Sequence, residues 1–293
     1  MGFFRYDISS ISPVKLCIIP AILLLISLVV VGMTYMETGL PVQPGIEFQG
    51  GIGVTIVTDE TPDQIKERFA GFPIISVNEG INNGKYLKFG PMDDDKVSEL
   101  TKMIEGKYTD AKIDHIGSSF GKTLQDQATF AIIASFIGMA IVVFLIFRSF
   151  VPAAAVVISA FADMVMSAAA MNLLGIQLSL GTTAALLMLI GYSVDSDILL
   201  TSRVLKRKGK FEEKVEGAFQ TGFNMTTTTF VAILAMLVVS WVGGIEIIHQ
   251  MSQVLLIGLI FDVMNTWLTN AGILKWYATE GKGRISTSLR GGA

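Results

Sequence analysis

The sequence has very few of the residues that build disulfide frameworks and metal sites. Its 293 residues include one cysteine, Cys17, and two histidines, His115 and His249. A single thiol cannot form an intramolecular disulfide, and two isolated histidines provide no metal-ligand spacing. We therefore expect neither a structural disulfide, nor a metal site, nor a bound cofactor.

Charged residues are also scarce. They make up 16% of the chain, where soluble domains usually have roughly 25%, and 51% of the residues are hydrophobic. The mean hydropathy is +0.58. A formal net charge of −3 provides no basic surface for nucleic acid. This composition indicates a membrane protein and argues against a nucleic-acid-binding one.

Six apolar runs are long enough to cross a bilayer, for which a helix needs ~20 residues. They cover residues 16–36, 128–147, 151–174, 178–200, 226–245 and 251–274. The first run lacks the short core and small-residue cleavage site of a signal peptide, so we expect an uncleaved anchor. Residues 224–229 are expected to open the fifth helix, after a re-entry turn at Gly222 and Phe223.

The region between the first two runs, residues 37–122, has the character of a soluble domain. It contains nine Lys/Arg and fourteen Asp/Glu residues. A capping box at Thr61 and three acids from Asp93 predict two helix starts. An Asn-Gly hairpin signal at 82–84 predicts two paired strands. With further strands at 53–58 and 111–116, the order is βαββαβ, which is the ferredoxin-like pattern.

The predicted fold is therefore a polytopic α-helical membrane protein with a ferredoxin-like α+β domain between its first two helices. Six helices place all the Lys- and Arg-rich short loops and both chain ends on one side. By the positive-inside rule that side is cytoplasmic, and the α+β domain lies outside the cell. The predicted divisions are an N-terminus with the first helix (1–36), the outer domain (37–122), helices two to six (123–277) and a cytoplasmic tail (278–293).

Two carboxylates, Asp195 and Asp197, lie within the fourth apolar run. Ionisable groups at membrane depth cost ~2.5–3.5 kcal/mol each on insertion scales, so they indicate function. Residues two apart on a helix point ~200° apart, so these two cannot share a proton. We favour Asp195, on a face with small residues, as the proton carrier. Asp197 alternatively pairs with a Lys or Arg near the membrane surface.

Two further acids lie in apolar runs. Asp163 is ~16 Å from the cytoplasmic turn at helical rise, close to mid-bilayer. A structural alternative for it is a hydrogen bond to a hydroxyl of a neighbouring helix, for which residues 226–229 are candidates. Asp262 is similarly deep, with Asn265 on its side of the helix, and its alternative is a polar contact between helices. Several carboxylates in one bundle favour a proton path.

A glycine-rich motif, G-I-E-F-Q-G-G at 45–51, follows the first run. A phosphate-binding loop needs its glycines to lead into a helix N-terminus. Here Gly45, Glu47, Gly50 and Gly51 lead into a predicted strand, so nucleotide binding is not expected. We interpret the motif as a stiff connector followed by a tight bend, with a simple linker as the alternative.

The order of these elements and two motifs resemble the SecF family of the Sec protein-export machinery. The 45–51 motif resembles the family's Gly-Ile-Asp-Phe-x-Gly-Gly element. The segment I-G-Y-S-V at 190–194, with Gly191, Tyr192 and Ser193, resembles its fourth-helix signature, which is followed by acids and then Arg203. The bacterial pattern has its acid where this chain has Ser196, and the sixth helix is more polar. These differences resemble archaeal members.

The resemblance implies a non-enzymatic subunit that partners SecD, beside the Sec channel, in the cytoplasmic membrane. The family is related to resistance-nodulation-division transporters, so six helices correspond to half of a twelve-helix unit. It implies that proton flow drives export of an unfolded polypeptide. Asp195, Asp197, Asp163, Asp262 and Arg203 are the proton-coupling candidates.

Three other functions compete with this one. The chain is alternatively a passive scaffold that binds SecD or the exported polypeptide without moving protons. It is alternatively half of a small-molecule transporter of the resistance-nodulation-division type. An intramembrane aspartyl protease would need facing aspartates; Asp163 and Asp195 could face each other, but neither lies in a protease motif.

Overall fold

The computed structural model describes residues 11–80, 82–207 and 210–281, and six helical crossings occur within them. Five are single helices: α1 (Pro13–Thr38), α5 (Ser118–Phe147), α6 (Phe150–Leu174), α7 (Leu180–Lys206) and α8 (Phe211–Gly243). The sixth combines α9 (Glu246–Met264), the π-helix η1 (Asn265–Asn270), α10 (Ala271–Trp276) and the π-helix η2 (Tyr277–Gly281). Each crossing is long and apolar enough to span a membrane, so the predicted six crossings are confirmed.

Two of these helices begin earlier than their apolar runs. Helix α5 begins at Ser118, inside the range predicted for the outer domain, and α8 begins at Phe211. Helix α8 continues without a break through Gly222, so the predicted re-entry turn and helix start at 222–229 are wrong. The Thr228 and Thr229 hydroxyls donate to the Met225 carbonyl at 2.8 and 3.1 Å, which satisfies them within the helix.

Helices α6, α7 and α9 form the centre of the bundle. Helix α7 packs along α9, and α6 contacts both. Helices α7 and α9 approach each other closely at Gly258. A Cβ at this position would lie only 2.4 Å from Leu189 Cδ2. The α5–α6 connection is the predicted tight turn, with Arg148 in the left-handed region at φ 50°. Helices α1, α5 and α8 expose most of their apolar side chains.

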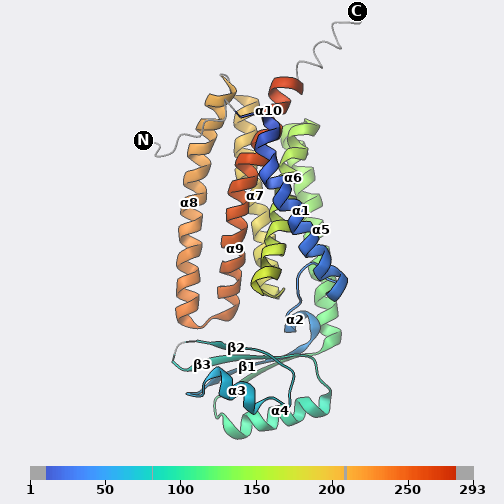
Figure 1. The fold of residues 1–293 in the computed structure, drawn as a ribbon, viewed down its shortest axis with the longest axis vertical. Coiled ribbons are helices and arrows are strands. Elements are labelled where there is room, and N and C mark those ends of the chain that lie inside the picture. The colour runs from blue at the N-terminus through green and yellow to red at the C-terminus, as the bar shows by residue number, and fades with distance from the viewer. Residues whose placement is uncertain (1–10, 81, 208–209, 282–293) are drawn as a thin grey trace, which may run out of the picture.

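An α+β domain lies beyond one end of the bundle (Figure 1). Its elements are α2 (Ile46–Gln49), β1 (Gly51–Val57), α3 (Pro62–Arg68), β2 (Ile74–Glu79), β3 (Gly84–Phe89), α4 (Asp94–Lys107) and β4 (Lys112–Ile116). The strands form one antiparallel sheet in the order β2-β3-β1-β4. The predicted alternation βαββαβ is confirmed, and the short α2 is an addition inside the glycine motif.

Helices α3 and α4 cover the sheet face that points away from the bundle (Figure 1). Their apolar residues and the sheet's enclose a core that includes Ile52, Ile65, Phe69, Phe89 and Leu100. The Phe69 and Phe89 rings meet edge to face with centroids 5.6 Å apart. The other sheet face points towards the bundle and carries polar side chains.

Local sequence signals fix the connections of this domain. The backbone N–H of Gln64 donates to Thr61 Oγ1 at 3.4 Å, and the backbone N–H of Thr61 donates to Gln64 Oε1 at 2.9 Å. These two bonds complete the predicted capping box. Asn82 and Asn83 have φ values of 53° and 60°, so the two residues with left-handed backbone in this hairpin connection are both asparagines, and Gly84 already belongs to β3.

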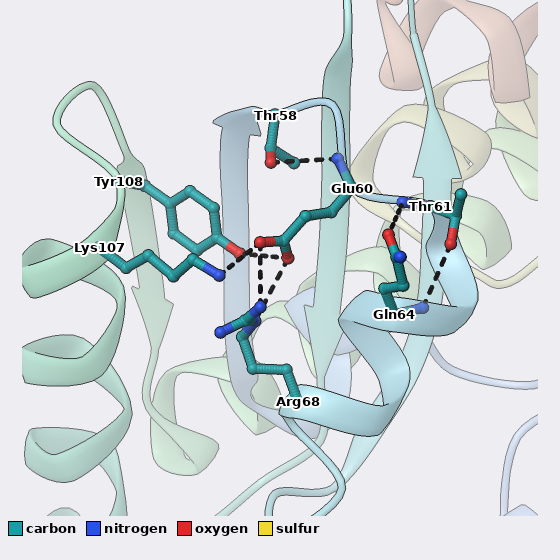
Figure 2. Close-up of polar contacts among 7 residues, drawn as sticks. All are labelled: Thr58, Glu60, Thr61, Gln64, Arg68, Lys107 and Tyr108. Atoms are coloured by element: carbon teal, nitrogen blue, oxygen red, sulfur yellow. Dashed lines mark hydrogen bonds and ion pairs between the residues drawn. The ribbon is translucent and has the colours of Figure 1, made fainter.

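A polar network around Glu60 joins α3 to α4 (Figure 2). The Glu60 carboxylate accepts hydrogen bonds from Arg68, Lys107 and Tyr108. The bond from Lys107 is the main reason that the pKa of Glu60 lies below its ordinary value. Burial, with the Glu60 contact, raises the pKa of Tyr108 to about 12.

Helix α1 begins, and the sixth crossing ends, at the end of the bundle opposite the α+β domain (Figure 1). Lys275 of α10 donates to the carbonyl of Ile11 at 2.9 Å, so these two parts of the chain are also in contact. Both ends of the described chain therefore lie on the same side of the bundle, as six crossings require.

Candidate functional site: a buried carboxylate cluster

Three aspartates from three helices meet inside the bundle. Asp163 of α6 and Asp197 of α7 are fully buried, and Asp262 of α9 is 1% exposed. Their hydrogen-bond donors all come from α7 and from η1. We call these three residues, with the hydroxyl and amide groups that contact them, the carboxylate cluster.

Asp163 is held from both neighbouring helices. Ser193 Oγ of α7 donates to Asp163 Oδ2 at 2.6 Å. Asn265 Nδ2 of η1 donates to Asp163 Oδ1 at 2.6 Å. Each carboxylate oxygen therefore has a donor from a different helix. The predicted alternative, a hydrogen bond to a hydroxyl of a neighbouring helix, is therefore present, but its donor is Ser193 and not a residue among 226–229.

Asp262 is bonded mainly through hydroxyl groups. Ser196 Oγ donates to Asp262 Oδ1 at 3.0 Å, and Thr266 Oγ1 donates to the same oxygen at 3.2 Å. The Ser196 and Thr266 hydroxyls lie 3.1 Å apart, so a proton on either can point towards the other. Ser196, at the position of the bacterial acid, is therefore a hydroxyl member of the cluster, and α9 supplies the acid beside it.

Asp197 is the least satisfied member. Asn270 Nδ2 donates to Asp197 Oδ1 at 2.8 Å. Asp197 Oδ2 and Asn270 Oδ1 are both buried without a hydrogen-bond partner in the described part of the chain. A buried carboxylate oxygen without a donor is unfavourable when ionised, whereas a proton on it provides a donor for a nearby acceptor.

The π-helix η1 makes this arrangement possible. Residues five apart on an α-helix point ~140° apart. A π-helix bonds residues five apart and so brings them nearly above one another. Asn265 and Asn270, which are five apart, therefore face the same side and contact Asp163 and Asp197, respectively.

The side chains of this cluster offer carboxylic acid chemistry, that is, groups that can bind and release a proton. Within residues 11–80, 82–207 and 210–281, no ion pair involves these three aspartates. Ionised carboxylates that share a buried site repel one another, so a proton on one of them lowers the electrostatic energy of the cluster. Among the same residues, no group of three or more His, Cys, Asp or Glu side chains could hold a metal ion.

Apolar layers close the cluster on both sides. Towards the α+β domain lie Leu186, Ile190, Leu255 and Leu259. Towards the other end lie Leu200, Val204, Ala271 and Leu274.

The other predicted site residues of α7 lie outside the cluster. Asp195 is exposed, with Gly191 on the same exposed face, and Tyr192 is half-buried. Asp195 therefore faces away from Asp163, and the pair that a protease would need is not formed. Helical geometry separated Asp195 from Asp197 correctly, but the preference for Asp195 has no support in this arrangement.

Arg203 also lies apart from the acids. Its guanidinium donates to the Gly217 carbonyl and, at 2.7 Å, to Thr221 Oγ1, both on α8. These bonds join the ends of α7 and α8 that are distant from the α+β domain. Arg203 therefore connects two helices and does not contact an acid of the cluster.

The glycine motif forms the junction between bundle and outer domain. Gly45 N donates to the Leu178 carbonyl at 2.8 Å, and Glu47 Oε2 accepts from Leu180 N at 3.1 Å. Gly50 and Gly51 have φ values of 85° and 149°. A Cβ at Gly51 would lie 2.3 Å from the Phe89 carbonyl oxygen, so β1 can pair with β3 there only through glycine.

Asn270 and Thr266 were missed as partners of the acids. Their signal is the polar run D-V-M-N-T-W-L-T-N at 262–270 inside an apolar helix. Asn265 was placed beside Asp262 by its spacing, but its hydrogen bond goes to Asp163. The run identifies a polar helix face, and only the packing of α6 and α7 decides which acid each amide contacts.

Comparison with known proteins identifies relatives over the whole chain. The family described as "Protein export membrane protein SecD/SecF, C-terminal" matches residues 96–280. The chain is 50% identical over 281 residues to the protein-export membrane protein SecF of Methanolacinia petrolearia, covering 96% of this chain and 99% of the relative. It is 39% identical to SecF of Pyrococcus furiosus, covering 93% of each chain.

Solved structures share the fold. The crystal structure of SecDF, a translocon-associated membrane protein from Thermus thermophilus, matches with a TM-score of 0.71 and 20% identity. The match covers 95% of this chain and 39% of that chain. A SecDF crystal structure in a super-membrane-facing form matches with a TM-score of 0.63 and 19% identity, over 97% of this chain and 40% of that one.

Proposed function

Because the chain belongs to the SecF family of protein-export membrane proteins, we propose that it pairs with SecD in the Sec export machinery and couples export to proton movement. The carboxylate cluster is the observation that carries the proton role. Its three acids come from α6, α7 and α9, and their donors come from a neighbouring helix in most cases. A change of protonation therefore changes contacts between helices.

The coupling step is a change in helix packing. When Asp197 or Asp163 loses its proton, a negative charge appears in a site that has no cation to offset it. The bundle responds by admitting water or a donor, which requires α7 and α9 to move apart at the apolar layers. When the proton returns, the helices close again, as in other two-state switches driven by a local charge.

The pairing with SecD is supported by the exposed face of α7. Met188, Gly191 and Asp195 are exposed and follow helical spacing on a helix that is otherwise central. A carboxylate facing lipid is costly, and an exposed glycine allows another helix to approach closely. We propose that SecD covers this face and supplies a polar partner for Asp195.

The finer architecture is part of the proposal. The strand order β2-β3-β1-β4 supports a ferredoxin-like outer domain. The chain matches 39% of the length of SecDF, which supports one half of a twelve-helix unit of the resistance-nodulation-division type. Loop charges support cytoplasmic ends and an outer domain outside the membrane, where it would meet the exported polypeptide beyond the channel.

The proton role is tested by export assays on Asp163→Asn and Asp197→Asn in membranes that contain SecD and the channel. Asp126→Asn is the matched control, because it makes the same substitution at an exposed aspartate of α5 that lies outside the cluster and outside the proposed SecD face. We expect the two buried variants to lose the acceleration of export by a proton gradient while export without the gradient is unchanged. Full acceleration in the double variant would overturn the proton role.

A scaffold without proton transfer is the second candidate, and the exposure of Asp195 favours it. In that case Asp195→Asn would reduce co-purification with SecD, and the gradient would have no effect on any variant. Export that responds normally to the gradient in Asp195→Asn, together with intact co-purification, would remove the support for this candidate.

A further inference from the structure

The outer domain is joined to the bundle at two places that differ in their chemistry. The first is the segment 41–50, which we call the strap. Pro44 forms a parallel bridge with Leu178 of the α6–α7 loop. Leu178 N donates to the Gln43 carbonyl at 2.8 Å. The side chain of Asn172 accepts from Gln43 N and donates to the Pro41 carbonyl. The strap is therefore held through its backbone, and its Val42 and Phe48 side chains are buried in the core of the bundle.

The strap also caps a helix of the carboxylate cluster. Glu47 accepts from the amide of Leu180, the first residue of α7, and places a carboxylate at the positive end of that helix. The pKa of Glu47 lies above its ordinary value, because the effect of burial exceeds the opposite effects of the Leu180 bond and of Lys88. Gln125 of α5 donates to the Phe48 carbonyl at 2.7 Å, which fixes the strap from a second helix.

The second junction depends on one side chain. Glu246, the first residue of α9, accepts from Asn78 Nδ2 of β2 at 2.8 Å and from Gln250 Nε2 at 2.6 Å. Two cavities of about 430 and 940 Å³ lie beside this contact, and Asn78 and Glu246 line both. This junction therefore has few bonds and space to separate.

Lys88 lies beside the second junction. It lies on β3, and its side chain is on the sheet face that points towards the bundle, paired in register with Gly53. Lys88 is 7% exposed, and its Nζ lies 3.9 Å from Glu246 Oε1. A buried ammonium needs a partner of opposite charge, and Glu246 provides one at this junction.

We propose that the strap is a fixed hinge, that Glu246 is a releasable latch, and that Lys88 is the positioning residue that holds the latch closed. Helix α7 begins at the hinge and α9 begins at the latch. Both helices carry the carboxylate cluster, so a change in their spacing changes the distance between hinge and latch. The outer domain then rotates about the strap. This proposal rests on the proposed function for the origin of that movement.

The test fixes each junction in turn in the full chain with SecD and the channel. Cys17 is the only cysteine, so a Cys17→Ala background carries only introduced thiols. The hinge pair is Gly45→Cys with Gln177→Cys, because a Cβ at Gly45 lies 3.5 Å from Gln177 Cβ, within the ~3.5–4.5 Å that a disulfide needs.

The latch pair is Gly80→Cys with Ile245→Cys, joined by a short thiol-specific linker. A Cβ at Gly80 lies 3.3 Å from the Cα of Gly244, the neighbour of Ile245, and Glu246 and Lys88 stay intact. We expect export to continue when the hinge is oxidised. Linking the latch should abolish export, and reduction should restore it. Loss of export on hinge oxidation, or normal export with the latch linked, would overturn the proposal.

Lys88 is tested by the rate at which the latch pair reacts with the linker. Lys88→Met should slow linking because the latch is open more often, and Lys88→Arg should keep the original rate. The double variant Lys88→Glu with Glu246→Lys should restore linking by exchanging the two charges. An unchanged linking rate in Lys88→Met would show that Lys88 does not hold the latch closed.

The same experiment separates this proposal from the proton role. If export ignores the proton gradient but still stops when the latch is linked, the latch stands and the proton role fails. If export responds to the gradient but continues with the latch linked, the latch fails and the proton role stands.

Discussion

The outer domain and the bundle distribute their polar and apolar residues in opposite ways. The outer domain encloses apolar side chains such as Phe69 and Leu87, and its charged residues lie mostly on the surface. The bundle exposes large apolar side chains on α1, α5 and α8. Its centre contains three aspartates and the hydroxyl and amide groups that bond them.

This difference follows from the solvent of each part. In water, burial of apolar surface drives folding and selects an apolar core. Between helices in a bilayer that force is absent, so close packing of small residues and polar contacts hold the helices together. The polar groups at the centre of the bundle are therefore compatible with folding, while each one is available for function.

The largest effect is expected from breaking the apolar core of the outer domain. Phe69→Ala removes a fully buried ring that contacts Phe89, and such changes cost ~3–5 kcal/mol. Hydrogen–deuterium exchange of the sheet amides in the full-length protein should show strong loss of protection. Val57→Ala is the control. Val57 lies in the same sheet but is 64% exposed, so this variant should leave protection unchanged.

The bundle is more sensitive to added volume than to lost polarity. Gly258→Ala places a Cβ 2.4 Å from Leu189 Cδ2, and overpacking of this kind costs ~1–3 kcal/mol. The thermal midpoint of the purified protein should fall. Gly138→Ala is the matched control, since no atom lies within 4 Å of a Cβ there. Equal midpoints for the two variants would contradict the close approach of α7 and α9.

Ion pairs on the outer domain should make its stability depend on pH. The pKa of Glu60 is lowered in the folded state, chiefly by the Lys107 bond. Its contribution is therefore complete above the ordinary glutamate value of 4.5 and is lost as pH falls below it. Exposed pairs contribute ~0.2–1 kcal/mol each. Denaturant unfolding of the outer domain against pH should show this loss, and Glu60→Gln should remove it.

The smallest effect on stability is expected inside the cluster. Ser193→Ala deletes the 2.6 Å bond to Asp163, but hydrogen bonds between membrane helices average only ~0.6 kcal/mol. The thermal midpoint should hardly change, whereas the response of export to a proton gradient should decrease. A large drop in the midpoint would mean that this bond holds the bundle together.

The features that sequence predicted are those that depend on neighbours along the chain. The Thr61 capping box and the Asn82–Asn83 turn need only a few adjacent residues, and the crossings need only uninterrupted apolar length. The start of α8 at Phe211 was missed because its first turns are polar and hydropathy cannot detect them. The turn α2 was missed because Glu47 makes its contact with a residue far along the chain.

The site was predictable in its residue types but not in its partners. Helical spacing separates Asp195 from Asp197, yet only the packing of α6 and α9 decides which of them is buried. Ser196 was identified as the position of the expected acid, but its bond to Asp262 depends on α9 being beside it. The contact of Asn270 with Asp197 further requires a π-helix, for which the sequence has no simple signal.

The π-helix η1 lets the fold and the function be separated by changing the length of the chain. A π turn contains about one residue more than the α turn that it replaces. Deleting one residue from the interior of Asn265–Asn270 would let η1 become an α-helix, with both flanking segments still in register with their neighbours. Leu259 and Leu274 would keep their packing, while Asn265 and Asn270 could no longer serve two acids at once. A chain shorter by one residue would then form the same bundle around an incomplete carboxylate cluster.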